Sequence, residues 1–61
     1  MYKLKIDGQL IESEGTVQSS VSSSGRNVDS YLYLVAGVPI PMDTVPEDGS
    51  VVDAIRVASG G

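Results

Sequence analysis

The sequence predicts an α+β fold in which one short helix packs on one face of a mixed β-sheet of four to five strands. Three observations lead to this prediction: alternating apolar residues in several segments, turn residues between those segments, and one stretch with helical spacing. A chain of 61 residues has room for a single domain, residues 1–61, and only for a thin core.

The first predicted element is a β-hairpin. Residues 1–6 read MYKLKI, in which the apolar side chains fall on one face and the lysines on the other. Asp7-Gly8 is typical of a two-residue hairpin turn, so residues 9–12 are expected to form the returning strand.

The second element is a short helix. Thr16 is suited to cap its start, Val17 and Val21 are four residues apart on one helical face, and Gly25 is suited to end it. Five serines within residues 19–24 are mediocre helix formers, because their hydroxyls compete for backbone groups. A flexible serine-rich loop is therefore the alternative for this segment.

The remaining elements are strands. Residues 30–35 read SYLYLV and have the strongest strand pattern in the chain, and Ala36-Gly37 follows as a turn. Residues 38–40 read as a short strand that its prolines confine to a sheet edge. The last strand is expected over residues 51–58.

The last strand indicates which face of the sheet is buried. Asp53 lies in the middle of that strand, and an unpaired buried carboxylate is costly, so its face should be wet while Val52 and Ala54 point to the helix. Exposed apolar side chains on the wet face would form a surface for a protein partner. We call this surface the apolar patch; its residues are Leu32, Leu34, Ile55 and Val57. A reversed register, with the tyrosines outside, and a strand covered on both faces are the alternatives.

Composition excludes several classes of function. The absence of Cys and His removes the usual soft-metal ligands, thiol nucleophile and general base, so we expect no metal site and no self-contained catalyst. Four Lys and Arg against eight Asp and Glu give a net charge of −4, which disfavours binding to nucleic acid. The apolar runs are too short to span a membrane, and the first residues do not read as a signal peptide. The expectation is a monomeric cytoplasmic protein whose partners are proteins.

The sequence ends AIRVASGG, and the two final glycines have two interpretations. They are either a frayed end or a flexible, slender tail that enters a narrow enzyme channel. In the second interpretation, the carboxylate of Gly61 is unhindered for activation and acyl transfer, and Gly60 keeps the approach to it narrow.

The order and spacing of these segments resemble the ubiquitin-like sulfur carriers and small archaeal modifiers of the ThiS/MoaD type. Thr16-Val17 stands where these proteins open their helix. Ala36 stands where the family often has Asn, and the serine run replaces the usual Leu and Glu. The segments that carry the resemblance are MYKLKIDGQLIE at 1–12, LYLVAGVPIP at 32–41 and PEDGSVVDAIRVASGG at 46–61.

This resemblance implies a β-grasp fold and a carrier function centred on Gly61. An ATP-dependent adenylating enzyme would activate the carboxylate, with ATP and magnesium bound by that enzyme and no cofactor bound by this chain. A sulfur donor would then form a thiocarboxylate for thiamine, molybdopterin or tRNA thiolation, or a target lysine would form an isopeptide bond. The apolar patch would dock the activating enzyme. A different class, a non-catalytic adaptor that uses only the sheet face, is the remaining hypothesis.

Overall fold

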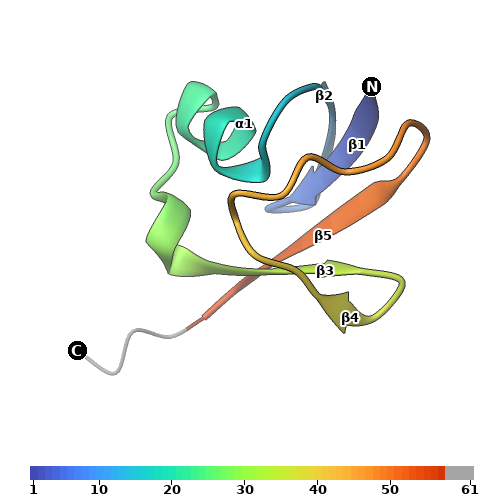
Figure 1. The fold of residues 1–61 in the computed structure, drawn as a ribbon. Coiled ribbons are helices and arrows are strands. Elements are labelled where there is room, and N and C mark those ends of the chain that lie inside the picture. Colours follow the sequence, from blue (N-terminus) through green and yellow to red (C-terminus); the bar gives the residue numbers. More distant parts are fainter. Residues whose placement is uncertain (58–61) are drawn as a thin grey trace.

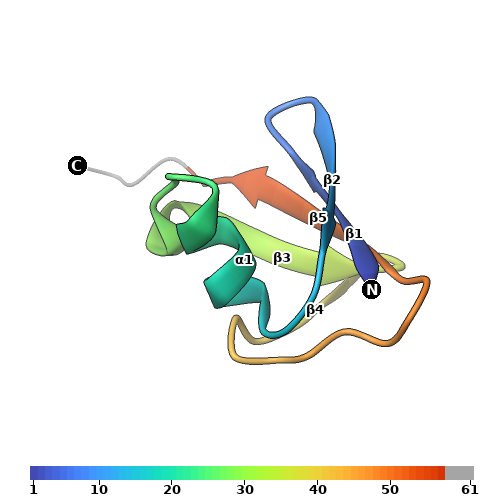
Figure 2. The ribbon, with the colours of Figure 1, turned by 90° about the horizontal axis from the view of Figure 1, so that it is seen from above.

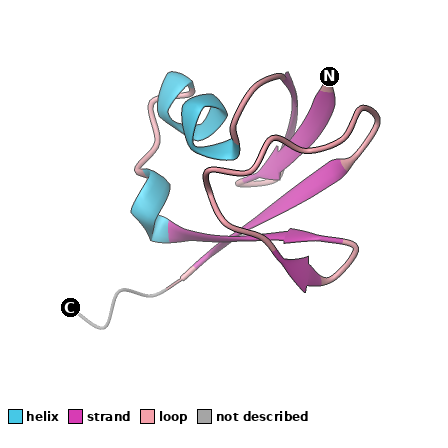
Figure 3. Ribbon diagram, in the orientation of Figure 1, coloured by secondary structure: helices cyan, strands magenta, loops and turns pink. Residues whose placement is uncertain are grey.

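A five-stranded mixed sheet with one short α-helix on one face forms the structure, a computed structural model that describes residues 1–57 (Figures 1 and 3). This architecture confirms the predicted α+β class. The elements in chain order are β1 (Tyr2–Ile6), β2 (Gln9–Ser13), α1 (Val17–Ser23), the 3₁₀ turn η1 (Val28–Ser30), β3 (Tyr31–Val35), β4 (Val38–Pro39) and β5 (Val51–Arg56).

The strand order β2-β1-β5-β3-β4 places the last described strand at the centre of the sheet. β5 runs parallel to β1 on one side and antiparallel to β3 on the other. The other pairs, β1 with β2 and β3 with β4, are antiparallel. Figure 2 shows the end of β5 beside the start of β3, where Arg56 lies opposite Tyr31.

Two tight turns fix the register of the outer strands. Asp7 and Gly8 have φ of 50° and 76°, and Ala36 and Gly37 have φ of 52° and 80°. Positive φ at both central residues is the signature of a type I′ hairpin, whose twist matches that of paired strands. Both predicted turns are therefore present, and Ala36 occupies a left-handed conformation that an alanine rarely adopts.

The start of α1 is capped from two directions. The hydroxyl oxygen of Thr16 accepts the N–H of Ser19 at 3.2 Å, as predicted for the N-cap. The N–H groups of the first two helical residues donate to the carbonyls of Thr44 and Met42, at 3.1 and 2.8 Å. The loop of residues 41–50 thus satisfies donors that a helix leaves unpaired at its start.

The end of α1 is also closed by hydrogen bonds. Gly25 has a φ of 82°, and its N–H donates to the carbonyl of Ser22 at 3.0 Å. The N–H of Arg26 reaches back to the carbonyl of Val21 at 3.3 Å, which completes a Schellman motif. The serine-rich segment is thus helical through Ser23, as predicted, and the loop alternative does not hold there.

The core lies between α1 and the sheet. Its buried apolar residues are Tyr2, Leu4, Ile6, Val17, Val21, Tyr31, Tyr33 and Val52. The tyrosine rings fill this core and direct their hydroxyls to polar partners at its rim: Tyr33 donates to the carbonyl of Val28 at 2.7 Å. The predicted register is confirmed, since Tyr33 and Val52 face the helix.

Several predicted boundaries are wrong. β3 begins at Tyr31, because η1 precedes it; the Asn27 side chain starts that turn by accepting the N–H of Asp29 at 3.1 Å. β4 ends at Pro39, one residue earlier than predicted. β5 ends at Arg56, and the last predicted strand residue, Ala58, lies outside the described residues.

Candidate functional site

The face of the sheet opposite α1, which we call the open face, brings part of the apolar patch together. Leu32 and Ile55 lie directly opposite each other on β3 and β5 and are 44% and 49% exposed. Leu34 is only half-buried rather than fully exposed, and it lies opposite Asp53. Val57, 41% exposed, follows the end of β5. The centre of the patch is thus the pair Leu32–Ile55, and a carboxylate borders it.

Sequence reasoning missed two exposed apolar residues of the same face. Leu10 lies opposite Lys5 on β1, which in turn lies beside Asp53 on β5, so the three side chains share a row with Leu34. Val51, 44% exposed, lies beside Lys3. The predicted turn at Asp7-Gly8 pairs residue 5 with residue 10, so it could have placed Leu10 on the same face as Lys5. The open face is therefore a mosaic of apolar and charged side chains.

The end of β5 is held firmly in the sheet. Arg56 lies opposite Tyr31, and the N–H of Val57 donates to the carbonyl of Ser30 at 3.0 Å. This bond to η1 continues the attachment one residue beyond the strand. The two residues predicted as the carrier site, Gly60 and Gly61, lie outside the described residues.

A charged cluster ties together the elements near this end of the sheet. Asp7 accepts hydrogen bonds from Nε of Arg26 at 2.7 Å and from the hydroxyl of Tyr31 at 2.8 Å. The Arg26 bond, followed by the Tyr31 bond, lowers the pKa of Asp7, and the charge of Arg56 adds to the effect. The same carboxylate raises the pKa of Tyr31. The first hairpin, the segment after α1 and β3 are thereby joined.

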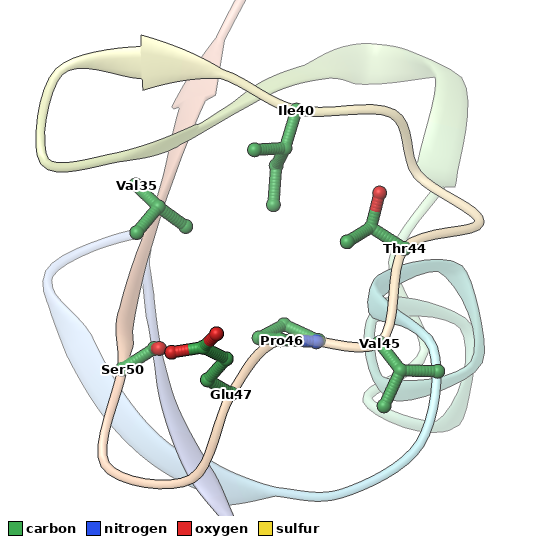
Figure 4. A pocket seen from close by; sticks show the side chains of 7 residues that line it. All are labelled: Val35, Ile40, Thr44, Val45, Pro46, Glu47 and Ser50. Carbon is green, nitrogen blue, oxygen red and sulfur yellow. The ribbon is translucent and has the colours of Figure 1, made fainter.

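A second surface feature lies at the opposite end of β5, where loop 41–50 meets the turn of β3 and β4 (Figure 4). It is an open hollow of about 350 Å³, which we call the loop hollow. Its lining residues are Val35, Ile40, Thr44, Val45, Pro46, Glu47 and Ser50. Sequence reasoning did not find it, because residues 41–50 have no periodic pattern.

Residues 1–57 were searched for a metal-binding group, an unpaired buried polar atom and a membrane-spanning helix. Within residues 1–57, no three carboxylates gather into a group able to hold a metal ion. In that same part of the chain, every buried side-chain nitrogen or oxygen has a hydrogen-bond partner. No helix of the described residues is long and apolar enough to cross a membrane. The candidate site described so far is the open face of the sheet beside the end of β5.

The sequence matches no model of a known protein family, and no curated protein matches it. The residues and their geometry are consequently the basis of the functional proposal.

Proposed function

We propose that this chain is a ubiquitin-like carrier protein of the β-grasp fold, whose Gly61 carboxylate is adenylated by a partner enzyme and converted to a thiocarboxylate for sulfur transfer. The fold proposal is supported by the mixed five-stranded sheet with one short helix on one face. The proposed working residues, Gly60 and Gly61, follow β5 in the sequence after Val57, Ala58 and Ser59.

The observation that best supports this function is the position of β5. A strand that is paired on both sides cannot shift without breaking two ladders of hydrogen bonds, so β5 provides a rigid base for the residues that come after it. The bond from Val57 to the Ser30 carbonyl extends that base to the last described residue. A carrier needs such a base, because the enzyme must find the carboxyl group at a fixed place relative to the docked domain.

The proposed chemistry takes place at the carboxyl group of Gly61 and is catalysed by the partner. A carboxylate oxygen attacks the α-phosphate of ATP and pyrophosphate leaves. Hydrosulfide delivered by a sulfur donor then attacks the carbonyl carbon of the mixed anhydride, the bond from that carbon to the phosphate oxygen breaks, and the thiocarboxylate and AMP are the products. Glycine suits this position because no Cβ shields the carbonyl. The partner supplies ATP, magnesium and the catalytic groups, and this chain supplies the carboxyl group and a docking surface.

The apolar patch is the proposed docking surface for the adenylating enzyme. Leu32 on β3 and Ile55 on β5 are both exposed and lie opposite each other, one residue before the end of β5. Burial of this pair would provide apolar contact area at the centre of an interface, and the bordering Asp53 would favour one orientation of the partner. The same surface would then contact the sulfur-accepting synthase.

The function of a protein modifier shares the first step of this proposal. If a lysine of a target protein attacks the activated carbonyl instead of sulfur, the product is an isopeptide-linked conjugate. We place either reaction in the cytoplasm, with this chain acting as a monomer. The two functions differ in the nucleophile. The product at Gly61 therefore distinguishes them: a thiocarboxylate for the sulfur carrier and an isopeptide bond for the modifier.

Hydroxylamine trapping tests the activation step. The chain, tagged at its N-terminus, is incubated with ATP and an extract of the cells that produce it, with and without hydroxylamine. An activated carboxyl is expected to become a hydroxamate at Gly61, located by fragmentation mass spectrometry. Omission of ATP and deletion of residues 60–61 are the controls. An unmodified carboxyl under all conditions contradicts the proposal.

A non-catalytic adaptor is a second candidate function, and the exposure of Leu32 and Ile55 favours it. An adaptor would bind its partner through the open face alone. Deletion of residues 60–61 would then leave partner binding and cellular function unchanged, whereas Ile55→Ser would abolish both. A carrier loses function in both variants, so this pair of variants distinguishes the two classes.

A further inference from the structure

The loop hollow has apolar walls that are open to solvent. Figure 4 shows the side chain of Ile40 pointing into it from the edge opposite Pro46, with Val35 to one side. Val45, at a neighbouring edge, is 63% exposed. The volume of the hollow is about 350 Å³. One water molecule occupies about 30 Å³ of the liquid, so the hollow is large enough to admit a side chain.

The walls of the hollow are preorganised by backbone hydrogen bonds. The carbonyls of Met42 and Thr44 accept from the start of α1, and Lys3 donates its N–H to the carbonyl of Ser50 at 2.8 Å. A loop fixed at both ends loses little conformational entropy when a ligand binds, which favours recognition at this place. The loop that forms the walls is therefore anchored to α1 at one end and to β1 at the other.

The surroundings of the hollow are acidic. Loop 41–50 contains three acidic residues, Asp43, Glu47 and Asp48, and no Lys or Arg. Glu47 lines the hollow, is exposed, and makes no salt bridge within residues 1–57. Asp48, its neighbour, is paired with the amino group of Met1. One unpaired carboxylate of the described residues thus lies at the edge of an apolar hollow.

We propose that the loop hollow binds an arginine side chain presented by a partner protein. The methylene stem of an arginine would pack against Val35, Ile40 and Pro46, and its guanidinium would reach Glu47. Arginine fits this combination because its stem is apolar and its head is more weakly hydrated than an ammonium group. The acidic surroundings would attract a basic segment and repel an acidic one.

This site goes beyond the proposed carrier function and does not depend on it. The loop hollow lies at the start of β5, and the proposed activation site comes after its end. Six strand residues separate the two ends by about 20 Å, at about 3.3 Å per residue. A partner with a basic segment could therefore bind while an enzyme holds the other end.

Chemical-shift titration of the complete chain tests this inference. The probe is the blocked peptide acetyl-Gly-Arg-Gly-amide, and the matched control peptide carries citrulline, which has the same shape without the charge. The arginine peptide is expected to move the amide signals of Val35, Ile40, Val45 and Glu47 while those of Leu32 and Ile55 stay in place. The citrulline peptide is expected to bind about fivefold more weakly, the loss that one partly exposed ion pair accounts for.

Two variants make the assignment specific. Glu47→Gln is expected to lower the affinity for the arginine peptide to that for citrulline. Asp43→Asn, which removes a charge from the same loop without altering the lining, is expected to leave it nearly unchanged. The proposal is overturned if arginine and citrulline peptides bind alike, or if the shifts fall elsewhere. Because the chain lacking residues 60–61 should give the same result, a failed carrier test does not affect this one.

Discussion

The two faces of the sheet differ in how far residues of the same strands are exposed. On β3, Tyr33 is 2% exposed beneath α1, whereas its neighbour Leu32 is 44% exposed on the open face. On β5, Val52 is fully buried and Ile55 is 49% exposed. One helix of seven residues covers only one face. The comparison indicates that the apolar residues of the open face do little for folding and are available for a partner.

The largest expected effect comes from truncating the same residue type on each face. Leu4 is fully buried, so Leu4→Ala should lower the free energy of unfolding by about 2–5 kcal/mol. A domain of this size is only a few kcal/mol stable, so this variant should be largely unfolded. Leu32→Ala should change stability by no more than about 0.5 kcal/mol. Urea titrations followed by circular dichroism measure both, and equal losses would contradict the division between the faces.

The next effect tests how the covering helix is held in place. Thr16→Ala removes the N-cap acceptor for Ser19 and should destabilise the chain by about 1 kcal/mol. Thr16→Ser keeps the hydroxyl and serves as the control, with a much smaller loss expected. If both variants have the same urea midpoint, the cap does not hold α1 over the core.

A stabilising change is expected at the edge of the sheet. Ala36 has a φ of 52°, so Ala36→Gly relieves an unfavourable conformation and should raise stability by about 0.5–1 kcal/mol. Ala54→Gly, in β5, is the matched control and should lower stability, because glycine is unfavourable in a strand. Thermal unfolding of the two variants gives the answer, and a lower midpoint for Ala36→Gly would refute the strain at that turn.

The smallest expected effect is the pH dependence due to Asp7, because its partners are partly solvated. Its pKa is lower in the folded chain than in the unfolded chain, chiefly through Arg26. The ionised form therefore stabilises the fold above the unfolded pKa of about 4, and this contribution is lost as the pH falls through the lower folded value. Asp7→Asn, which also tolerates positive φ, should lower the melting temperature at pH 7.

The difference between Asp7→Asn and the unmodified chain should shrink as the pH falls below about 4. Asp43→Asn serves as the control, since Asp43 is exposed and makes no salt bridge within residues 1–57. A constant difference between pH 7 and pH 3 would show that the Asp7 charge does not contribute.

Local signals account for the parts of the fold that the sequence predicts well. The turn at Asp7-Gly8 and the helix end at Gly25 depend on residues that favour one backbone conformation. The burial of Tyr33 and Val52 follows from a period of two and one carboxylate on the other face. The turn η1 was missed because it depends on one side-chain hydrogen bond of Asn27 rather than on a pattern.

Tertiary contacts account for what the sequence does not predict at the candidate sites. The loop hollow depends on carbonyls of Met42 and Thr44 that accept hydrogen bonds from α1, a segment far away in the sequence. The patch residues Leu32 and Ile55 were found because Asp53, in the middle of the last strand, indicated which face of the sheet is wet. The glycines at 60 and 61 remain a prediction from sequence.

Fragmentation mass spectrometry of the protein isolated from its own cells measures the proposed carrier state most directly. We expect a fraction of the molecules to be heavier by the difference between one sulfur and one oxygen atom, with the added mass on Gly61. A carboxylate that stays unmodified in cells containing all the partner enzymes, or a mature chain that continues past Gly61, would contradict the carrier function.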